Sequence, residues 1–425
     1  MLTKLKPKSE FNRNVFTLIT GTTIAQAVPI AISPILTRIY TPEDFGVFAL
    51  YMAIAAIISV IATGRYEMAI MLPKKDEDVR SIVKLILILL SSVVIFVFLI
   101  VFIFNQEITE LFENKEISNW LYFLPLSIFL VGVYQVVNYL LIREKSFKRL
   151  AKNKVIVSTS NASIQLAIGL SSASSFGLLF GNLMGYIVSI FFIIRSKIIN
   201  KYFHLRELPI KKVANEYKNF PKYDLPSVLI NLLANQLPFF ALGKYFSLGI
   251  LGYYSLMYKV LMMPINLLSN TVLDVFKQKA TEDYNKYGNC KSIYISTLKK
   301  LFLLGIIPFT ILGIFAPDLF AFVFGNNWRV AGEFAQIMTP MLFMKFVVGP
   351  LSYTFYISNN QFYNLAGQLI LFCLIFVSIY YGIQSDDEYL MIIFFSISNC
   401  IAYLFYLGLS YKFSKGDSNG FIYEK

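Results

Sequence analysis

Three basic side chains stand inside long apolar runs of this sequence: Arg65, Lys259 and Lys345. A charge within a membrane span costs about 2.5–3.5 kcal/mol on insertion scales, so such residues usually face a cavity or a partner. Lys259 comes about 15 Å after the predicted start of its helix at Gly249, and Lys345 is similarly central. Neither ammonium can easily reach a lipid headgroup, which leaves a cavity lining or a structural ion pair. Arg65 lies nearer the end of its run, where it can also anchor to lipid phosphates.

Two acidic residues lie near the ends of apolar runs. Glu67 is two positions from Arg65, and side chains two apart do not face each other on a continuous helix. We therefore expect no Arg65–Glu67 pair. Asp274 lies one position off Glu67 in the internal repeat described below, and it either packs at a helix end or has a functional role.

Uncharged polar residues gather in the first and seventh predicted spans. Gln26 belongs to the first span, and Asn231 and Asn235 lie one helical turn apart in the seventh. Such side chains either form interhelical hydrogen bonds or line a cleft that binds sugar hydroxyls.

The sequence offers few of the residue patterns that soluble enzymes use for catalysis. His204 is the single histidine, so a Ser/His/Asp triad or a histidine metal site is not expected. The three cysteines, Cys290, Cys373 and Cys400, have no metal-ligand or disulfide spacing, and a buried apolar role is expected for them. No glycine-rich phosphate loop occurs. We predict a protein without catalytic residues, metal or cofactor.

The elements that must position these residues are transmembrane helices. Of the 425 residues 56% are hydrophobic and only 15% are charged, which is typical of a membrane protein. Repeated apolar runs of about 20 residues are long enough to cross a bilayer as helices. The predicted spans are residues 14–39, 44–72, 82–104, 119–142, 152–171, 175–195, 224–243, 249–275, 298–316, 331–354, 362–383 and 388–411. The span 152–171 is the most polar and needs polar neighbours inside a bundle.

Orientation follows from the basic residues. With the N-terminus inside, the outside loops contain only Arg38, Lys115, Lys244 and Arg329 of the 38 lysines and arginines. This bias predicts that both termini are cytoplasmic. It also explains the net charge of +13 without a nucleic-acid partner.

An internal repeat relates the two halves. Residues 36–52 (LTRIYTPEDFGVFALYM) match residues 242–258 (LGKYFSLGILGYYSLMY) at an offset of 206 positions, which pairs Gly46 with Gly252. In the first copy Thr41 and Asp44 form a capping-box pattern. Six spans on each side of a basic linker predict a parallel repeat around a central cleft. The predicted domains are a six-helix lobe (1–195), a cytoplasmic linker (196–223) and a second six-helix lobe (224–425).

The first 75 residues resemble a known family. The segments Leu36-Thr37-Arg38-Ile39-Tyr40-Thr41-Pro42, Phe45-Gly46 and Gly64-Arg65-Tyr66-Glu67 resemble those of Wzx-type O-antigen flippases. These belong to the multidrug/oligosaccharidyl-lipid/polysaccharide exporter superfamily. The second half carries the resemblance only in its span count, repeat and loop charge.

The resemblance implies an all-α fold like that of the multidrug and toxic compound extrusion (MATE) transporters. It implies transport of an undecaprenyl-diphosphate-linked oligosaccharide from the cytoplasmic to the periplasmic leaflet of the bacterial inner membrane by alternating access. It also suggests an ion gradient, of H⁺ or Na⁺, as the driving force. Membrane lipid and other O-antigen assembly proteins are the implied partners.

The predicted roles divide the site residues into three groups. Substrate binding is expected of Arg65, Lys259, Lys345, Asn231, Asn235 and Gln26. Ion coupling is expected of Glu67 or Asp274, and Arg38 and Lys244 form a predicted outer gate, or else anchor to lipid phosphates. Alternatives are a flippase for a capsule or exopolysaccharide unit, a membrane polysaccharide polymerase or ligase, and an exporter of small cations or drugs.

Overall fold

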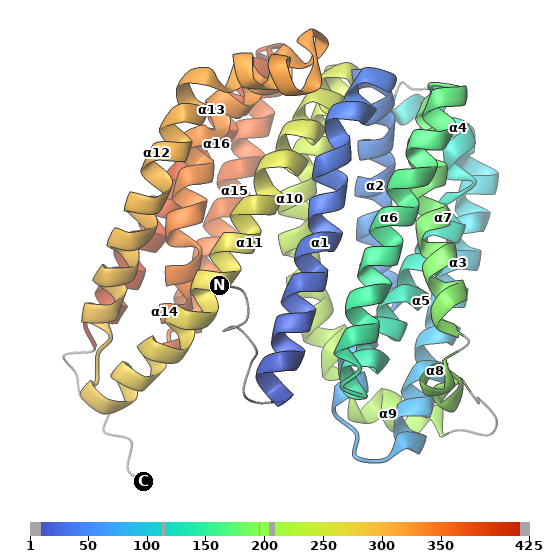
Figure 1. The fold of residues 1–425 in the computed structure, drawn as a ribbon, viewed down its shortest axis with the longest axis horizontal. Helices are drawn as coiled ribbons and strands as arrows, with labels where there is room; N and C mark the ends of the chain where they lie inside the picture. Colours follow the sequence, from blue (N-terminus) through green and yellow to red (C-terminus); the bar gives the residue numbers. More distant parts are fainter. Residues whose placement is uncertain (1–9, 113–114, 195, 204–208, 417–425) are drawn as a thin grey trace, which may run out of the picture. The chain divides into compact units, whose positions relative to one another are not determined.

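The computed structural model describes residues 10–112, 115–194, 196–203 and 209–416, and the regular elements in these ranges are all helical. Each predicted span corresponds to one long helix (Figure 1). These helices are α1 (Glu10–Ile39), α2 (Pro42–Ala62), α3 (Asp76–Leu111), α5 (Leu124–Arg143), α6 (Phe147–Ser171), α7 (Ser175–Ile194), α10 (Leu225–Tyr245), α11 (Leu248–Tyr287), α12 (Lys291–Phe324), α13 (Arg329–Val348), α15 (Gln361–Gln384) and α16 (Glu388–Ser414). Several extend beyond their predicted ends, and the predicted span 44–72 ends as an α-helix at Ala62.

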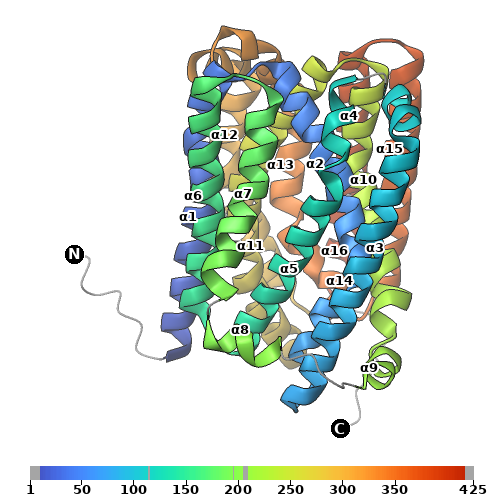
Figure 2. The ribbon, with the colours of Figure 1, turned by 90° about the vertical axis from the view of Figure 1, so that its right-hand side faces the viewer.

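Eleven of the helices in the described part of the chain are long and apolar enough to cross a membrane. The twelfth, α6, is the polar span for which polar neighbours were expected. It packs between α1 and α7 (Figures 1 and 2). The Tyr40 hydroxyl donates to the Gln165 carbonyl at 2.6 Å, and the Gln165 side-chain amide donates to the Leu178 carbonyl at 3.0 Å. Hydrogen bonds to neighbouring helices thus satisfy polar groups of α6, as buried polar groups require.

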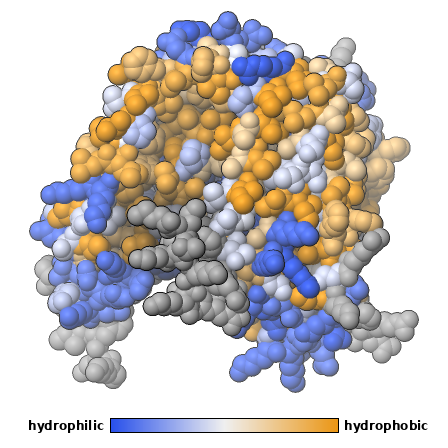
Figure 3. Space-filling model, in the orientation of Figure 1, coloured by the Kyte–Doolittle hydropathy of each residue, from blue (hydrophilic) through white to orange (hydrophobic). Residues whose placement is uncertain are grey.

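The chain forms two compact units, residues 1–252 and 253–425. The first unit contains α1 to α10 and the first residues of α11, and the second contains the rest of α11 and α12 to α16. The predicted division at residues 195 and 224 stays a prediction. On the face that Figure 3 shows, hydrophobic side chains cover the middle of the helices, and hydrophilic ones gather at helix ends.

The predicted linker contains short helices that pack on α3 and α5 within the first unit. They are α8 (Lys197–Tyr202) and α9 (Ile210–Glu216), which the π-helical turn η3 (Phe220–Asp224) follows, while His204 lies outside the described residues. Lys201 Nζ lies 2.7 Å from Asp76 and 3.1 Å from Glu144. The buried Tyr202 hydroxyl donates to the same two carboxylates. These contacts lower the pKa of Glu144, mainly through the Tyr202 hydrogen bond, and join α8 to α3 and α5.

The predicted cap is present at the start of α2. The corresponding position of the repeat, at the start of α11, has a related cap. The Asp44 amide donates to Thr41 Oγ1 at 3.2 Å, and the Thr41 amide donates to Asp44 Oδ2 at 3.0 Å. This reciprocal pair confirms the capping box. At the start of α11 the Ile250 amide donates to Ser247 Oγ at 3.1 Å. Ser247 and Ile250 are offset from Thr41 and Asp44 by the 206 positions of the repeat.

The two repeat copies meet through their paired glycines. A Cβ atom added to Gly46 would overlap the Leu248 carbonyl, and one added to Gly252 would overlap the Pro42 carbonyl. Leu248 corresponds to Pro42 in the repeat, so each copy makes the same backbone contact with the other. Only glycine lets two backbones approach this closely. All four residues belong to the first unit.

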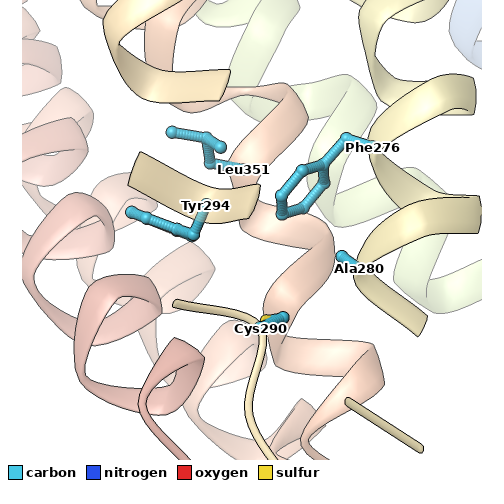
Figure 4. Close-up of a cluster of buried hydrophobic side chains, with 5 residues drawn as sticks. All are labelled: Phe276, Ala280, Cys290, Tyr294 and Leu351. Carbon is cyan, nitrogen blue, oxygen red and sulfur yellow. The ribbon is translucent and has the colours of Figure 1, made fainter. Parts of the chain in front are cut away.

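The second unit is held by packing of α12 on α13, of α13 on α16, and of α15 on α16. A buried cluster of Phe276, Ala280, Cys290, Tyr294 and Leu351 lies where α11, α12 and the 3₁₀ turn η5 (Pro350–Tyr353) meet (Figure 4). Burial raises the pKa of the Cys290 thiol to about 11. Cys290 is therefore a small apolar core residue, as expected from the sequence. The same expectation was wrong for Cys373, which is exposed, and Cys400 is half-buried.

The glycine contact predicts an unusual response to a single methyl group. Gly46→Ala and Gly252→Ala should each destabilise the protein by about 1–3 kcal/mol, because the backbones must separate. The measurement is the thermal unfolding midpoint in detergent. The control is Gly408→Ala, since a Cβ at this helical glycine meets no atom within 4 Å among the described residues. An equal midpoint for all three variants would contradict the contact.

Candidate functional site

Arg65 and Glu67 lie directly after α2, at a break in the α-helical conformation. Gly64 and Arg65 both have positive φ angles, 58° and 63°, and a 3₁₀ helix, η2 (Tyr66–Met71), follows. Glycine adopts this conformation readily, whereas an arginine does so at a cost. The strained backbone turns the Arg65 side chain away from the direction that a continuous helix would give it.

The break brings Arg65 between two carboxylates. Its Nη1 lies 3.2 Å from Glu67 Oε1, and its Nε donates to Asp224 Oδ2 at 2.7 Å. The expectation that Arg65 and Glu67 do not pair was wrong, because it assumed a helix through residue 67. Asp224, at the start of α10, was not foreseen because it lies beside the linker and its pairing depends on the tertiary fold.

Glu67 is almost completely buried, with a side chain 2% exposed. Its Oε1 accepts from Arg65, and its Oε2 has no hydrogen-bond partner among the described residues. A buried carboxylate depends strongly on its partner. Arg65 is thus first a partner for Glu67 and Asp224, and its predicted contact with substrate stays a prediction.

Lys259 on α11 and Lys345 on α13 differ from Arg65 in their charged partners. Both are half-buried within candidate spans of the second unit. Neither ammonium makes an ion pair in the part of the chain that the structure describes. The sequence left two alternatives for these lysines, a cavity lining and a structural ion pair. The described residues give no support to the ion pair.

The predicted amide residues have two different environments. Asn235 Nδ2 donates to the carbonyl and side-chain oxygens of Asn231, at 2.7 and 3.1 Å, and both residues are exposed on α10. Polar side chains within a membrane span usually face the bundle interior or a water-filled cavity. Gln26 on α1 is half-buried, and its Oε1 has no partner among the described residues.

The remaining predicted residues lie at helix ends or on exposed surfaces. Asp274 is exposed within α11, which continues to Tyr287, so the alternative that it packs at a helix end was wrong. Arg38 Nη1 donates at 2.5 Å to the Pro34 carbonyl in the last turn of α1. Lys244 Nζ lies 5.3 Å from the ring centre of Tyr245. The outer gate and the role of Asp274 stay predictions.

Sequence reasoning did not single out one further lysine. Lys154, near the start of the predicted span 152–171, lies in the second turn of α6 and is half-buried. Its Nζ donates to Thr22 Oγ1 on α1 at 3.3 Å. The exposed neighbours Lys148 and Lys152 hid this difference, because the sequence alone does not show which side of α6 faces α1.

In the described part of the chain, eleven of the twelve long helices are long and apolar enough to cross a membrane, which defines a multi-pass membrane protein. Solved structures share this fold. A lipid II flippase MurJ in an inward closed conformation has a TM-score of 0.74 at 15% identity, covering 93% of this chain and 89% of that one. An inward-facing MATE family multidrug resistance transporter of the MOP superfamily has a TM-score of 0.60 at 14% identity, covering 96% and 95%. A MOP superfamily transporter from Pyrococcus furiosus has a TM-score of 0.60 at 15% identity, covering 93% of each chain.

The sequence itself gives the family. Residues 35–333, more than half of the chain, match the model of the polysaccharide biosynthesis protein family. The chain belongs to this family. No curated protein matches it. The predicted all-α transporter fold is thus confirmed, and the named proteins that share it are flippases and transporters rather than enzymes.

The Arg65 pairs predict an asymmetric pattern of stability. Arg65→Ala leaves the buried Glu67 carboxylate unpaired and should cost about 3–5 kcal/mol. Asp224→Asn should cost about 1 kcal/mol or less, because the Asp224 side chain is 39% exposed. Adding Glu67→Gln to Arg65→Ala should restore part of the loss. The measurement is unfolding in detergent. Equal losses for the two single variants, or no rescue, would show that Arg65 does not stabilise Glu67.

Proposed function

We propose that this protein moves an undecaprenyl-diphosphate-linked oligosaccharide unit of O-antigen across the bacterial inner membrane, from the cytoplasmic to the periplasmic leaflet. Membership of a polysaccharide biosynthesis family supports the substrate class. The fold is shared with the lipid II flippase MurJ, which supports transport rather than synthesis. The basic residues of the predicted inside loops support cytoplasmic termini.

The observation that carries the proposal is the pair of uncompensated lysines in the second unit. Lys259 and Lys345 lie within candidate spans without an ion-pair partner in the described ranges. An ammonium in such surroundings is stabilised by an anion, and one cation about 4 Å from an anionic group contributes about 4 kcal/mol at an effective dielectric constant of 20. A diphosphate supplies this anion. A cationic drug would be repelled, which disfavours a drug exporter.

The other predicted residues complete the proposed cycle. Asn231 and Asn235 are exposed on α10, and in this proposal their amides bind sugar hydroxyls. Glu67 has an unpartnered buried oxygen that can take up a proton or contact Na⁺, so it is a stronger coupling candidate than the exposed Asp274. In this proposal a gradient of H⁺ or Na⁺ drives alternating access, while the polyprenyl tail remains in lipid.

Leaflet exchange of a fluorescent lipid-linked oligosaccharide tests the function. The purified chain is reconstituted into vesicles, and the fraction of probe exposed to an external quencher is followed with and without a proton or sodium gradient. We expect exchange faster than in empty vesicles, and faster with the gradient of the coupling ion. Exchange equal to that in empty vesicles would overturn the proposal. Probes with O-antigen, capsule or exopolysaccharide units identify the glycan class.

The two lysines predict a specific loss in the same assay. Lys259→Ala and Lys345→Ala should each lower the initial exchange rate at least tenfold at limiting probe concentration, because the diphosphate loses a cation. Lys300→Ala is the matched control, since Lys300 is an exposed lysine of the same unit. Protein amount and unfolding midpoint are compared for all variants. Rates equal to that of the control variant would remove both lysines from the binding site.

A further inference from the structure

The first unit also contains a cation without a carboxylate partner. Lys154 lies on α6, which packs between α1 and α7. In the described parts of these three helices the only acidic residue is Glu10, at the start of α1 and about 18 Å along the helix from Thr22. The single hydrogen-bond partner of Lys154 in the described chain is the neutral hydroxyl of Thr22, at 3.3 Å. Its charge is therefore uncompensated.

Close packing of α1 on α6 determines where this ammonium lies. A Cβ atom on Gly21 would overlap the Cβ of Ala151, so the two helices are in tight contact at this level. Lys154 follows Ala151 by three positions, and Thr22 follows Gly21 directly. The adjacent Lys152 is exposed on the same helix. Lys154 is thus held beside α1, unlike its exposed neighbour Lys152.

An unused acceptor lies one helical turn further along α1. Gln26 follows Thr22 by four positions, which places both on one face of the helix. Its Oε1 is buried and has no hydrogen-bond partner among the described residues. A buried acceptor without a partner is costly, so this oxygen suits a ligand that brings a donor. An ammonium, a hydroxyl and an open acceptor thus follow one another along the contact between α1 and α6.

We propose that Lys154, Thr22 and Gln26 form a subsite in the first unit for a phosphorylated glycan headgroup. Lys154 Nζ and the Thr22 hydroxyl donate to a phosphate oxygen, and Gln26 Oε1 accepts from a hydroxyl of the adjoining sugar. The subsite deepens the proposed function and rests on it. It gives the first unit a phosphate-binding lysine that is distinct from Lys259 and Lys345 of the second unit.

Equilibrium binding tests the subsite without transport. The full chain is placed in phosphatidylcholine nanodiscs and titrated with undecaprenyl diphosphate, with and without one attached N-acetylglucosamine. Lys154→Met keeps the side-chain length and removes the charge, and should weaken binding of both probes at least tenfold. Lys154→Arg should bind within about threefold of the unmodified chain. Lys152→Ala is the matched control on α6 and should leave binding unchanged.

Gln26→Leu separates the sugar contact from the phosphate contact. It should weaken binding of the sugar-bearing probe and leave undecaprenyl diphosphate unaffected. Unfolding midpoints of all variants are compared, and for a variant that unfolds Thr22→Val provides the test, because it also removes a phosphate donor. Equal affinities for Lys154→Met and Lys152→Ala would overturn the subsite while leaving the proposed function intact.

A lipid anchor is the alternative source of the phosphate. If the unmodified chain and Lys154→Met bind both probes equally in phosphatidylcholine but differ in stability in phosphatidylglycerol nanodiscs, Lys154 binds a membrane phosphate and the subsite is wrong. If the unmodified chain binds neither probe, the subsite and the proposed function both fail.

Discussion

The close approach of two carbonyls to two glycines organises the first unit. Gly46 of α2 lies against the backbone of Leu248, and Gly252 of α11 lies against that of Pro42. A side chain at either glycine would separate the backbones, so the start of α11 can reach α2 only because both positions lack Cβ atoms. Because the same contact is made twice in exchanged roles, the repeat is a feature of the structure as well as of the sequence.

Much of the fold could be predicted because a bilayer restricts it. Only helices satisfy their backbone groups within a span, so apolar runs of sufficient length determine the helices directly. The cap at Thr41 was equally predictable, because its two hydrogen bonds join residues three positions apart. The polar helix α6 required the additional argument that its side chains find partners in a bundle, and the Gln165 hydrogen bonds agree with it.

The site was less predictable, for a physical reason. The sequence gives the depth of a charge within the membrane but not the partner that it meets. Two positive φ angles turn Arg65 to Glu67, and the fold brings Asp224 from 159 positions away. For Lys154 the sequence concealed the partner in another way. Its position among surface lysines gave no sign that it faces α1. A count of charges along the sequence says nothing of the pairing of either residue.

Pairing is what separates structural charges from charges available to a substrate. Arg65 and Lys201 each meet two carboxylates, and both join elements that are distant in the sequence. Lys154, Lys259 and Lys345 meet no carboxylate in the described residues, although a half-buried ammonium would gain from one. Lysines bound to the protein's own acids would gain stability but could not attract an anionic ligand. In the proposed function these lysines stay unpaired within the protein, and the diphosphate of the substrate supplies the missing charge each time it binds.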